Sequence, residues 1–391
     1  MMKVINTPPL GWNSWNTFTW EINEDLIKET VDTMVEKGYK DAGYEYVIID
    51  DCWSLKERDE NGRLVPDPKK FPNGMKAVAD YIHAHGLKFG MYSCAGPLTC
   101  AGYPGSYEHE QIDAETFAEW EVDYLKYDFC FHSAAVTGPN LYRRMGVALA
   151  NCGREILFSA CSWGICETAY WAKTIGAGAW RSTADIMDNF NSIRKLALEQ
   201  FNKHIYAGKG CFNDMDMLVV GMERTGNIDG DDHDDLNACG PTEYRTHFSF
   251  WALLNSPLIM GCDIRKVKEE YRVMMQNKEV LAINQDPAQG QAFEVYNNMQ
   301  DPQGYNHPKE NSTWAKYLAN GDIAIGMFNF SDRDSRNFIT MESIGLPESC
   351  GKTVELLDVW SGEKIEVKNG IYMTGLKAHD CRLFRAKVIN K

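Results

Sequence analysis

Two aspartates in this sequence have neighbours that suit them to nucleophilic and acid–base chemistry. Asp128 ends the segment YLKYD, in which Lys126 stands two residues earlier and therefore projects from the same face of a strand. A cation at that position favours the ionised carboxylate. Asp185 follows Arg181 in the segment AWRSTAD, where a loop can bring it opposite Asp128. One charged and one protonated carboxyl are what cleavage of a glycosidic bond requires, so the pair predicts that chemistry.

Both aspartates also have a purely structural interpretation. Asp128 and Lys126 can form a buried ion pair that holds the end of a sheet together. Asp185 comes shortly after Ser182 and Thr183, and an aspartate in this setting can cap the N-terminus of a helix. Residue types and spacing alone leave these interpretations open.

Other residues are suited to holding a sugar. Asp50 and Asp51 end the apolar run YEYVIID, and ionised carboxylates accept hydrogen bonds from paired hydroxyls. Because adjacent strand residues face opposite sides until the strand ends, one of the two can bind a hydroxyl while the other caps or turns the chain. Trp15 and Trp53 offer flat faces for the C–H side of a pyranose, although aromatic residues are more often part of a core.

The elements that must position these residues alternate along the chain. Short apolar runs alternate with longer amphipathic stretches, which is the pattern of βα units around a parallel sheet. The runs PLGWNSW, YEYVIID, LKFGMYS, DYLKYD, EILFSAC, AWRSTAD, CFNDMDML and SPLIMGC predict a (β/α)₈ TIM barrel, whose strands converge with their C-terminal ends on one mouth. Polar or aromatic residues stand at nearly all of these ends: Trp15, Asp50, Asp51, Tyr92, Lys126, Asp128, Ser162, Trp163, Arg181, Asp185, Asp214 and Asp216.

The pattern changes near residue 288, after the segment NQDPAQG. Beyond it, short alternating segments such as DIAIGMFNF, TVELLDVW and EKIEVKN predict strands. We therefore predict an α/β chain with a catalytic (β/α)₈ barrel over residues 1–288 and a C-terminal antiparallel β-sandwich over residues 289–391. The acidic, glycine-rich stretch 221–240 predicts a long loop that is either a lid or a subunit contact.

The overall charge restricts the partners. The 391 residues include 40 basic and 55 acidic ones, and the net charge of -15 disfavours nucleic acid and membrane surfaces while it suits a neutral or cationic ligand. The histidines and cysteines show no zinc spacing, so we expect no metal and no cofactor. A metal-dependent barrel hydrolase that uses Asp50, Asp51, Asp214 and Asp216 as oxygen ligands is the alternative. Pairing into a homo-oligomer stays open.

The beginning of the chain and its cysteines bear on location. The segment MMKVINT contains no apolar stretch or cleavage site of a signal peptide, which predicts a cytoplasmic protein. A secreted chain whose signal had been removed would begin in the same way, so secretion stays open. The 12 cysteines are too few for a disulfide scaffold, and most are expected to be buried thiols.

Taken in order, the motifs resemble those of glycoside hydrolase family 27, which contains α-galactosidases and α-N-acetylgalactosaminidases. The similar segments lie between about Pro8 and Pro287 and include LGWNSW, VIIDDCW, KFGMYS, TCAGYPGS, DYLKYDFC, WRSTADI, NDMDMLVVG and SPLIMGCDI. The resemblance implies that Asp128 is the nucleophile and Asp185 the acid/base of a retaining double displacement. It also implies a galactose site lined by Trp15, Asp50, Asp51, Tyr92, Lys126, Arg181 and Asp216.

The resemblance extends to the cysteines. Cys100 in TCAGYPG and Cys130 in YDFC match a family pair that commonly forms a disulfide beside the nucleophile, and here they are either bridged or two thiols near the sugar. Where secreted members have another bridging cysteine before the first helix, this chain has Trp20, which leaves Cys52 without that partner. This departure favours a reducing compartment.

The loop CSWGIC bears on the substrate. Small residues at the positions of both Ser162 and Ile165 are typical of the family's N-acetylgalactosaminidases; Ser162 opens room at the 2-position of the sugar, whereas Ile165 crowds an acetamido group. A 2-hydroxyl tolerates either residue, so we expect removal of terminal α-D-galactose from oligosaccharides or glycoconjugates. The alternatives are an α-N-acetylgalactosaminidase and a non-catalytic carbohydrate-binding barrel. A subgroup that releases β-L-arabinopyranose tends to lose one of two paired aspartates, and Asp50 and Asp51 are both present.

Overall fold

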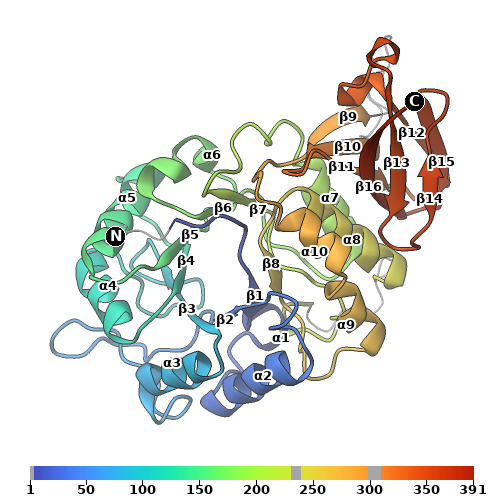
Figure 1. Cartoon of the computed structure of the whole chain (residues 1–391). Coiled ribbons are helices and arrows are strands. Elements are labelled where there is room, and N and C mark those ends of the chain that lie inside the picture. The colour runs from blue at the N-terminus through green and yellow to red at the C-terminus, as the bar shows by residue number, and fades with distance from the viewer. Residues whose placement is uncertain (1–3, 230–238, 298–309) are drawn as a thin grey trace.

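Eight parallel strands form the first part of the chain, as the sequence predicts (Figure 1). The structure is a computed structural model that describes residues 4–229, 239–297 and 310–391. The sheet order is β7-β6-β5-β4-β3-β2-β1-β8, and a parallel bridge between Leu218 and Met260 closes the ring. The strands are β1 (Leu10–Asn13), β2 (Tyr46–Ile48), β3 (Lys88–Cys94), β4 (Tyr124–Asp128), β5 (Leu157–Ala160), β6 (Ala179–Arg181), β7 (Phe212–Asp214) and β8 (Leu258–Met260).

Helices surround this barrel (Figure 1). The first long one, α2 (Glu24–Glu36), begins where the Asn23 side chain accepts a hydrogen bond from the Leu26 amide at 2.8 Å, and Glu24 and Asp25 in its first turn favour the N-terminal dipole. The other helices are α1 (Trp15–Phe18), α3 (Gly74–Ala84), α4 (Glu110–Glu119), α5 (Gly138–Asn151), α6 (Thr168–Trp171), α7 (Phe190–Leu198), α8 (Pro241–Leu253), α9 (Glu269–Met275) and α10 (Lys278–Asn284).

The barrel strands are buried on both faces, one toward the barrel interior and the other toward the surrounding helices. Tyr46, Tyr124, Leu157, Phe212 and Ile259 form a cluster of inward-pointing side chains that fills the barrel. Residues that alternate with these, together with the apolar faces of the helices, form the large core between the strands and the helical ring. The barrel interior is therefore a packed core, and the polar strand ends are left at its mouth.

A second unit of antiparallel strands follows the barrel (Figure 1). A six-stranded sheet in the order β14-β13-β16-β11-β10-β9 faces the pair β12 and β15, with a separate apolar core between them. The predicted boundary between residues 288 and 289 lies in the segment between α10 and β9. The strands are β9 (Phe293–Asn297), β10 (Asn311–Tyr317), β11 (Ile323–Asn329), β12 (Ser335–Thr340), β13 (Lys352–Asp358), β14 (Lys364–Glu366), β15 (Ile371–Leu376) and β16 (Cys381–Asn390).

Helix α8 connects the two units. It is buried on nearly all sides, because one face packs on the barrel and the other on β11 and β16. Phe250 of α8 makes edge-to-face contacts with Trp314 and Phe328 of the sandwich, with ring centroids 5.5 and 4.9 Å apart. These contacts fix the sandwich against the barrel.

The predicted long loop 221–240 is described only up to residue 229, and the remainder of its acidic stretch, 230–238, lies outside the described residues. The described part contains a short 3₁₀ helix, Asn227–Asp229, that contacts α1. Within the described residues, every helix is too short or too polar to cross a bilayer.

Candidate active site

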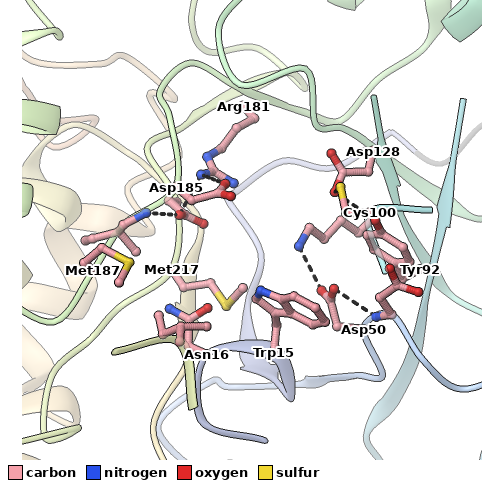
Figure 2. A pocket seen from close by; sticks show the side chains of 15 residues that line it. Trp15, Asn16, Asp50, Tyr92, Cys100, Asp128, Arg181, Asp185, Met187 and Met217 are labelled. Carbon is pink, nitrogen blue, oxygen red and sulfur yellow. Dashed lines mark hydrogen bonds and ion pairs between the residues drawn. The ribbon is translucent and has the colours of Figure 1, made fainter. Parts of the chain in front are cut away.

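One pocket at the C-terminal ends of the barrel strands collects most of the predicted site residues (Figure 2). These are Trp15, Asp50, Asp51, Tyr92, Cys100, Lys126, Asp128, Arg181, Asp185 and Asp216. Asn16, Ile186, Met187, Met217 and Ile228 line it as well, and neither their types nor their spacing marks them in the sequence.

Asp128 is fixed in the wall of this pocket at the end of β4. Its side chain is buried, Oδ1 accepts a hydrogen bond from the Phe129 amide, and Oδ2 accepts one from the Tyr92 hydroxyl, both at 2.9 Å. Burial raises the pKa of Asp128 to about 6, although Lys126 and these two donors act to lower it. The carboxylate has one orientation and little freedom, which suits a group that must attack a fixed carbon atom.

Lys126 does not pair with Asp128, contrary to the ion pair that the sequence suggests. Its ammonium donates instead to Asp50 Oδ2, at 2.8 Å, beyond the end of β2, which is two strands away in the barrel. The Asn13 amide donates to the same oxygen at 2.7 Å. Burial lowers the pKa of Lys126, but Asp50 more than offsets this, so the pKa lies well above its usual value. Lys126 therefore acts on Asp128 only through its field.

Both aspartates of the pair at the end of β2 enter the pocket, because the strand ends at Ile48 and the alternation of faces stops there. Asp51 is held by amides: Oδ1 accepts from Cys52 at 2.7 Å and Oδ2 from Ala101 at 3.0 Å. Burial raises the pKa of Asp51 despite these donors. Asp50 and Asp51 thus present oxygens in fixed positions for the hydroxyls of a ligand.

Arg181 joins the two acids on the other side of the pocket. Its Nη2 donates to Asp216 Oδ2 at 2.6 Å, to Asp185 Oδ1 at 2.7 Å and to the Ala184 carbonyl at 2.8 Å. Burial raises the pKa of Asp216 to about 6 even beside this guanidinium. Asp216 also has a φ of 83°, a left-handed conformation that is rare for aspartate and typical of residues held in place at a functional site.

Asp185 differs from Asp128 in being open to solvent, with 72% of its side chain exposed. It does not cap a helix, so that interpretation is wrong: α7 begins at Phe190, and Asn189 is its cap. Desolvation at the pocket acts to raise the pKa of Asp185, but Arg181 and then Lys126 more than offset it, and the pKa is lowered. Asp185 is placed where it can reach a group that enters from solvent.

The two candidate tryptophans have different roles. Trp15 lies in the pocket with its ring partly exposed (Figure 2), as a sugar platform would. Trp53 is buried, with its ring 5.7 Å from that of Trp120 and its indole nitrogen donating to the Tyr92 carbonyl at 3.0 Å. Trp53 is a core residue.

Cys100 and Cys130 are bonded as a disulfide whose Cα atoms are 5.2 Å apart. Cys100 lines the pocket, and its sulfur lies 3.7 Å from Asp128 Oδ2, whereas Cys130 is buried behind it. Cys52 is a free thiol, as predicted. The disulfide in the pocket favours an oxidising compartment, whereas the unpaired Cys52 favours a reducing one. The cytoplasmic location stays a prediction.

The acids do not form a cation site. In the part of the chain that the structure describes, the one group of three ligand atoms within 4.8 Å of one another is Cys100, Asp128 and Cys130, and the disulfide removes both thiolates from it. Asp50 pairs with Lys126 and Asp216 with Arg181, on opposite sides of the pocket. The metal-dependent alternative lacks a cluster of free carboxylates.

Comparisons with known proteins find one family over most of the chain. A family model described as Alpha galactosidase A matches residues 7–286, and one described as Alpha galactosidase C-terminal beta sandwich domain matches residues 309–386. The chain belongs to the α-galactosidase A family. The second β domain corresponds to the C-terminal beta sandwich domain of this family.

Individual proteins are similar over nearly the full length of this chain. The α-galactosidase of Cyamopsis tetragonoloba is 40% identical over 97% of this chain and 85% of the relative. The structure of the α-galactosidase MEL1 from Saccharomyces cerevisiae is similar with a TM-score of 0.87 and 31% identity, over 98% of each chain. A putative α-galactosidase/melibiase from Bacteroides fragilis has a TM-score of 0.89 and 36% identity, over 98% of this chain and 79% of the other.

Neither Ser162 nor Ile165 of the loop CSWGIC is among the residues that line the pocket. Ser162 is buried, its hydroxyl is hydrogen-bonded to that of Thr168, and it does not line the pocket. Ile165 is 46% exposed on the same loop, whose Gly164 amide donates to the Arg181 carbonyl at 3.1 Å. Ser162 therefore does not contact the pocket directly, and its influence at the 2-position of the sugar stays a prediction.

The loop that carries Cys100 is anchored to α4 by a buried ion pair. Arg58 donates to both carboxylate oxygens of Asp113, at 2.6 and 2.8 Å, and to the Gly105 carbonyl at 2.7 Å. Asp113→Ala will leave the mostly buried guanidinium without its partner and lower the free energy of unfolding by about 3–5 kcal/mol. Urea unfolding followed by tryptophan fluorescence measures this loss.

Glu119 at the end of the same helix provides the matched control. It pairs with Arg63 at 2.5 Å, and its side chain is 56% exposed. Glu119→Ala should cost less than about 1 kcal/mol, as exposed ion pairs do. Equal losses for the two variants would contradict the anchoring role of the buried pair.

Proposed function

We propose that this chain is a retaining exo-glycosidase that hydrolyses terminal α-D-galactose from oligosaccharides or glycoconjugates. The observation that carries the proposal is the arrangement of two carboxyls in one pocket, a buried, immobilised Asp128 and a solvent-open Asp185, with hydroxyl-binding aspartates and two cations between them. The family's members and their α-galactosidase names support the substrate.

Each step of the proposed double displacement uses these side chains alone. The Asp128 carboxylate attacks the anomeric carbon, the glycosidic C–O bond breaks, and Asp185 transfers its proton to the departing oxygen. Asp185 then takes a proton from a water molecule, whose oxygen attacks the same carbon and releases Asp128. Two inversions leave the α configuration in the product. No cofactor takes part in this scheme.

The pocket distributes the remaining tasks. Asp50 and Asp51 accept from hydroxyls on the side of Lys126. On the side of Asp185, Asp216 accepts from a hydroxyl and Arg181 donates to one. Trp15 covers the apolar side of the ring. Asp50 and Asp51 both line the pocket, so a hydrogen-bond acceptor is present for the 6-hydroxyl of a sugar. Galactose has this hydroxyl and arabinopyranose does not, so the pair favours galactose.

Side-by-side hydrolysis of 4-nitrophenyl α-galactoside and its 2-acetamido analogue tests the substrate. We expect kcat/KM for the galactoside to be larger by about a hundredfold, because poor steric fit of an added group costs on that order. Ile165→Ala should reduce this ratio if the isoleucine crowds the acetamido group. A dominant 2-acetamido substrate would make the chain an N-acetylgalactosaminidase, and galactose binding without hydrolysis would make it a binding protein.

A further inference from the structure

Asp214 is a strand-end acid to which the proposed mechanism gives no role. It is the last residue of β7. Phe212 of that strand points into the barrel, and Asn213 points outward and donates to Gln200 at 2.7 Å, so the alternation directs the Asp214 side chain into the barrel again. Asp214 does not line the pocket that contains the other predicted acids. Its carboxylate lies below that pocket, toward the barrel interior.

A smaller cavity separates the pocket from the apolar core of the barrel, and Asp214 faces it. The residues that line both the pocket and this cavity are Lys126, Arg181, Asp216 and Met217. The far wall of the cavity includes Ile48 and Ile259 of the barrel core. The Asp214 carboxylate is therefore directly behind the side chains that line the pocket, and it acts on a ligand through them.

Asp214 Oδ1 holds the backbone of Asp216. It accepts a hydrogen bond from the Asp216 amide at 2.9 Å, which is how an aspartate stabilises a turn two residues further on. The Asp216 backbone needs this support, because its φ of 83° is unfavourable for a residue with a side chain. The Trp251 indole nitrogen donates to the Asp216 carbonyl at 2.8 Å from the other side. Held in this way, Asp216 presents its carboxylate to the pocket.

The charge of Asp214 acts on the same part of the site. Arg181 and Asp214 are partners in the register of β6 and β7, so their side chains point to the same face of the sheet. Burial acts to lower the pKa of Arg181, but Asp216 and further acids, Asp214 among them, raise it well above its usual value. Burial raises the pKa of Asp216 to about 6, and the charges of Asp185 and Asp214 add to this rise while Arg181 opposes it.

We infer that Asp214 is a positioning residue for the Asp185 side of the pocket: its Oδ1 fixes Asp216 in the conformation that presents a carboxylate to a sugar hydroxyl, and its charge supports Arg181 from below. Arg181 holds the proposed acid/base Asp185 at 2.7 Å, so the same support extends to that carboxyl. The inference rests on the proposed function and adds to it a residue that lies outside the pocket.

Two substitutions separate the hydrogen bond of Asp214 from its charge. Asp214→Ala removes both, so Kd for galactose, measured by calorimetric titration, should rise about tenfold, which is the value of one hydrogen bond that orders a binding group. Asp214→Asn keeps an oxygen that can accept from the Asp216 amide, so Kd should stay within about threefold of the wild-type value.

Asp263→Ala is the matched control for loss of such a turn at the same end of the barrel. Asp263 follows β8, and its Oδ1 accepts from the Arg265 amide at 3.2 Å, two residues further on. Its side chain is 11% exposed and does not line the pocket. Kd for galactose should therefore be that of the wild type.

The pH dependence of galactose binding reports the charge of Asp214. Affinity should fall as the pH drops through about 6, because Asp216 then loses the charge with which it accepts from a hydroxyl. In Asp214→Asn this fall should begin at a lower pH, since one of the charges that raise the pKa of Asp216 is gone. The groups that face Asp216 are Arg181, Asp185, Asp214 and the Ile186 amide. The remaining acids of the pocket are the same in both proteins, so the difference between the two curves isolates Asp214.

Each outcome distinguishes positioning from packing. A raised Kd in Asp214→Ala that Asp214→Asn restores, with the acid shift of the curve in the asparagine variant, supports the inference. Wild-type affinity in both variants refutes it, and so does an equal loss in both with an unshifted curve. If Asp214→Ala does not fold, the asparagine curve decides alone, and an unshifted curve refutes the inference. A wild-type chain that binds galactose but hydrolyses no galactoside refutes the proposed function, while the binding data still test Asp214; a chain that does not bind galactose refutes both.

Discussion

Asp128→Asn will reduce kcat for 4-nitrophenyl α-galactoside on the order of 10⁴-fold or more. The amide has no negative charge with which to attack the anomeric carbon, and loss of a covalent nucleophile costs on that order in other hydrolases. The fold should persist, because asparagine has nearly the same shape and its oxygen can still accept from the Phe129 amide. Initial rates with the purified variant measure the loss, and galactose binding shows whether the pocket is intact.

The stereochemistry of the product gives a second readout of the same role. The wild-type chain should release α-galactose first, which proton NMR distinguishes from the β anomer before mutarotation. Asp334→Asn, an exposed aspartate of the sandwich, is the control for the substitution itself and should have the rate of the wild type. Substantial turnover by Asp128→Asn, or first release of the β anomer by the wild type, would refute double displacement at Asp128.

The sequence predicts the framework of the site well because strand ends are marked by chemistry. Apolar runs that stop at charged residues, as at Asp50 and Asp128, are unusual in a core and have a ready explanation at the mouth of a barrel. Each of the eight predicted runs coincides with a barrel strand, and only β3 extends past its run, by the one residue Cys94. The order of strands around the ring then brings residues more than 100 positions apart in the chain into one pocket.

Side-chain pairing was less predictable, because it depends on reach between strands. The period of a strand places Lys126 on the face of Asp128, but a long, flexible side chain can reach past the neighbouring strand. Lys126 of β4 does so and bonds to Asp50 at the end of β2. The partner of Ser162 was equally unpredictable, because its hydroxyl is hydrogen-bonded to that of Thr168. Spacing identifies candidates for a site, and only the fold decides which partner each one meets.

The uncharged side chains that line the pocket carry no signal in the sequence. Met187, Met217 and Ile228 are of types found throughout any core, and Asn16 is one polar residue in a run of mixed composition. Their common position depends on three separate loops, whose conformations follow from contacts such as that between Arg224 and Asp188. Acids next to cations are recognisable from sequence, whereas the apolar lining of a pocket becomes visible in the structure alone.

The pKa values of the two carboxyls stand in the opposite order from their proposed roles. A general acid is expected to have the raised pKa and a nucleophile the lowered one. Here burial raises the pKa of Asp128 to about 6, and Arg181 holds that of Asp185 below its usual range. The reactive form, with the proton on Asp185 and none on Asp128, is then a minor fraction of the singly protonated pair. We therefore assign the roles of Asp128 and Asp185 from their positions and not from their pKa values. The titration of a coupled pair does not show which of the two carboxyls holds the proton.

Asp185→Asn will therefore change the pH dependence as well as the rate. In the wild type, kcat/KM should fall as the pH rises above about 6, because the last proton of the pair then leaves and none remains for the departing oxygen. In the variant only Asp128 must be ionised, so this alkaline limb should vanish. The pKa of Asp128 should also fall below 6, since the charge of Asp185 that helps to raise it is gone.

The size of the loss should depend on the leaving group. Galactosyl-α-1,6-glucose releases an alcohol that needs a proton, so kcat/KM for it should fall about 10²–10⁴-fold in Asp185→Asn. The 4-nitrophenolate ion departs without one, so kcat/KM for the aryl galactoside should fall far less, while kcat falls because water is no longer deprotonated. Equal losses of kcat/KM for both substrates, or an alkaline limb that persists in the variant, would show that another group supplies the proton. A loss confined to the disaccharide would instead assign the acid to the exposed carboxyl and, by exclusion, the nucleophile to the buried one.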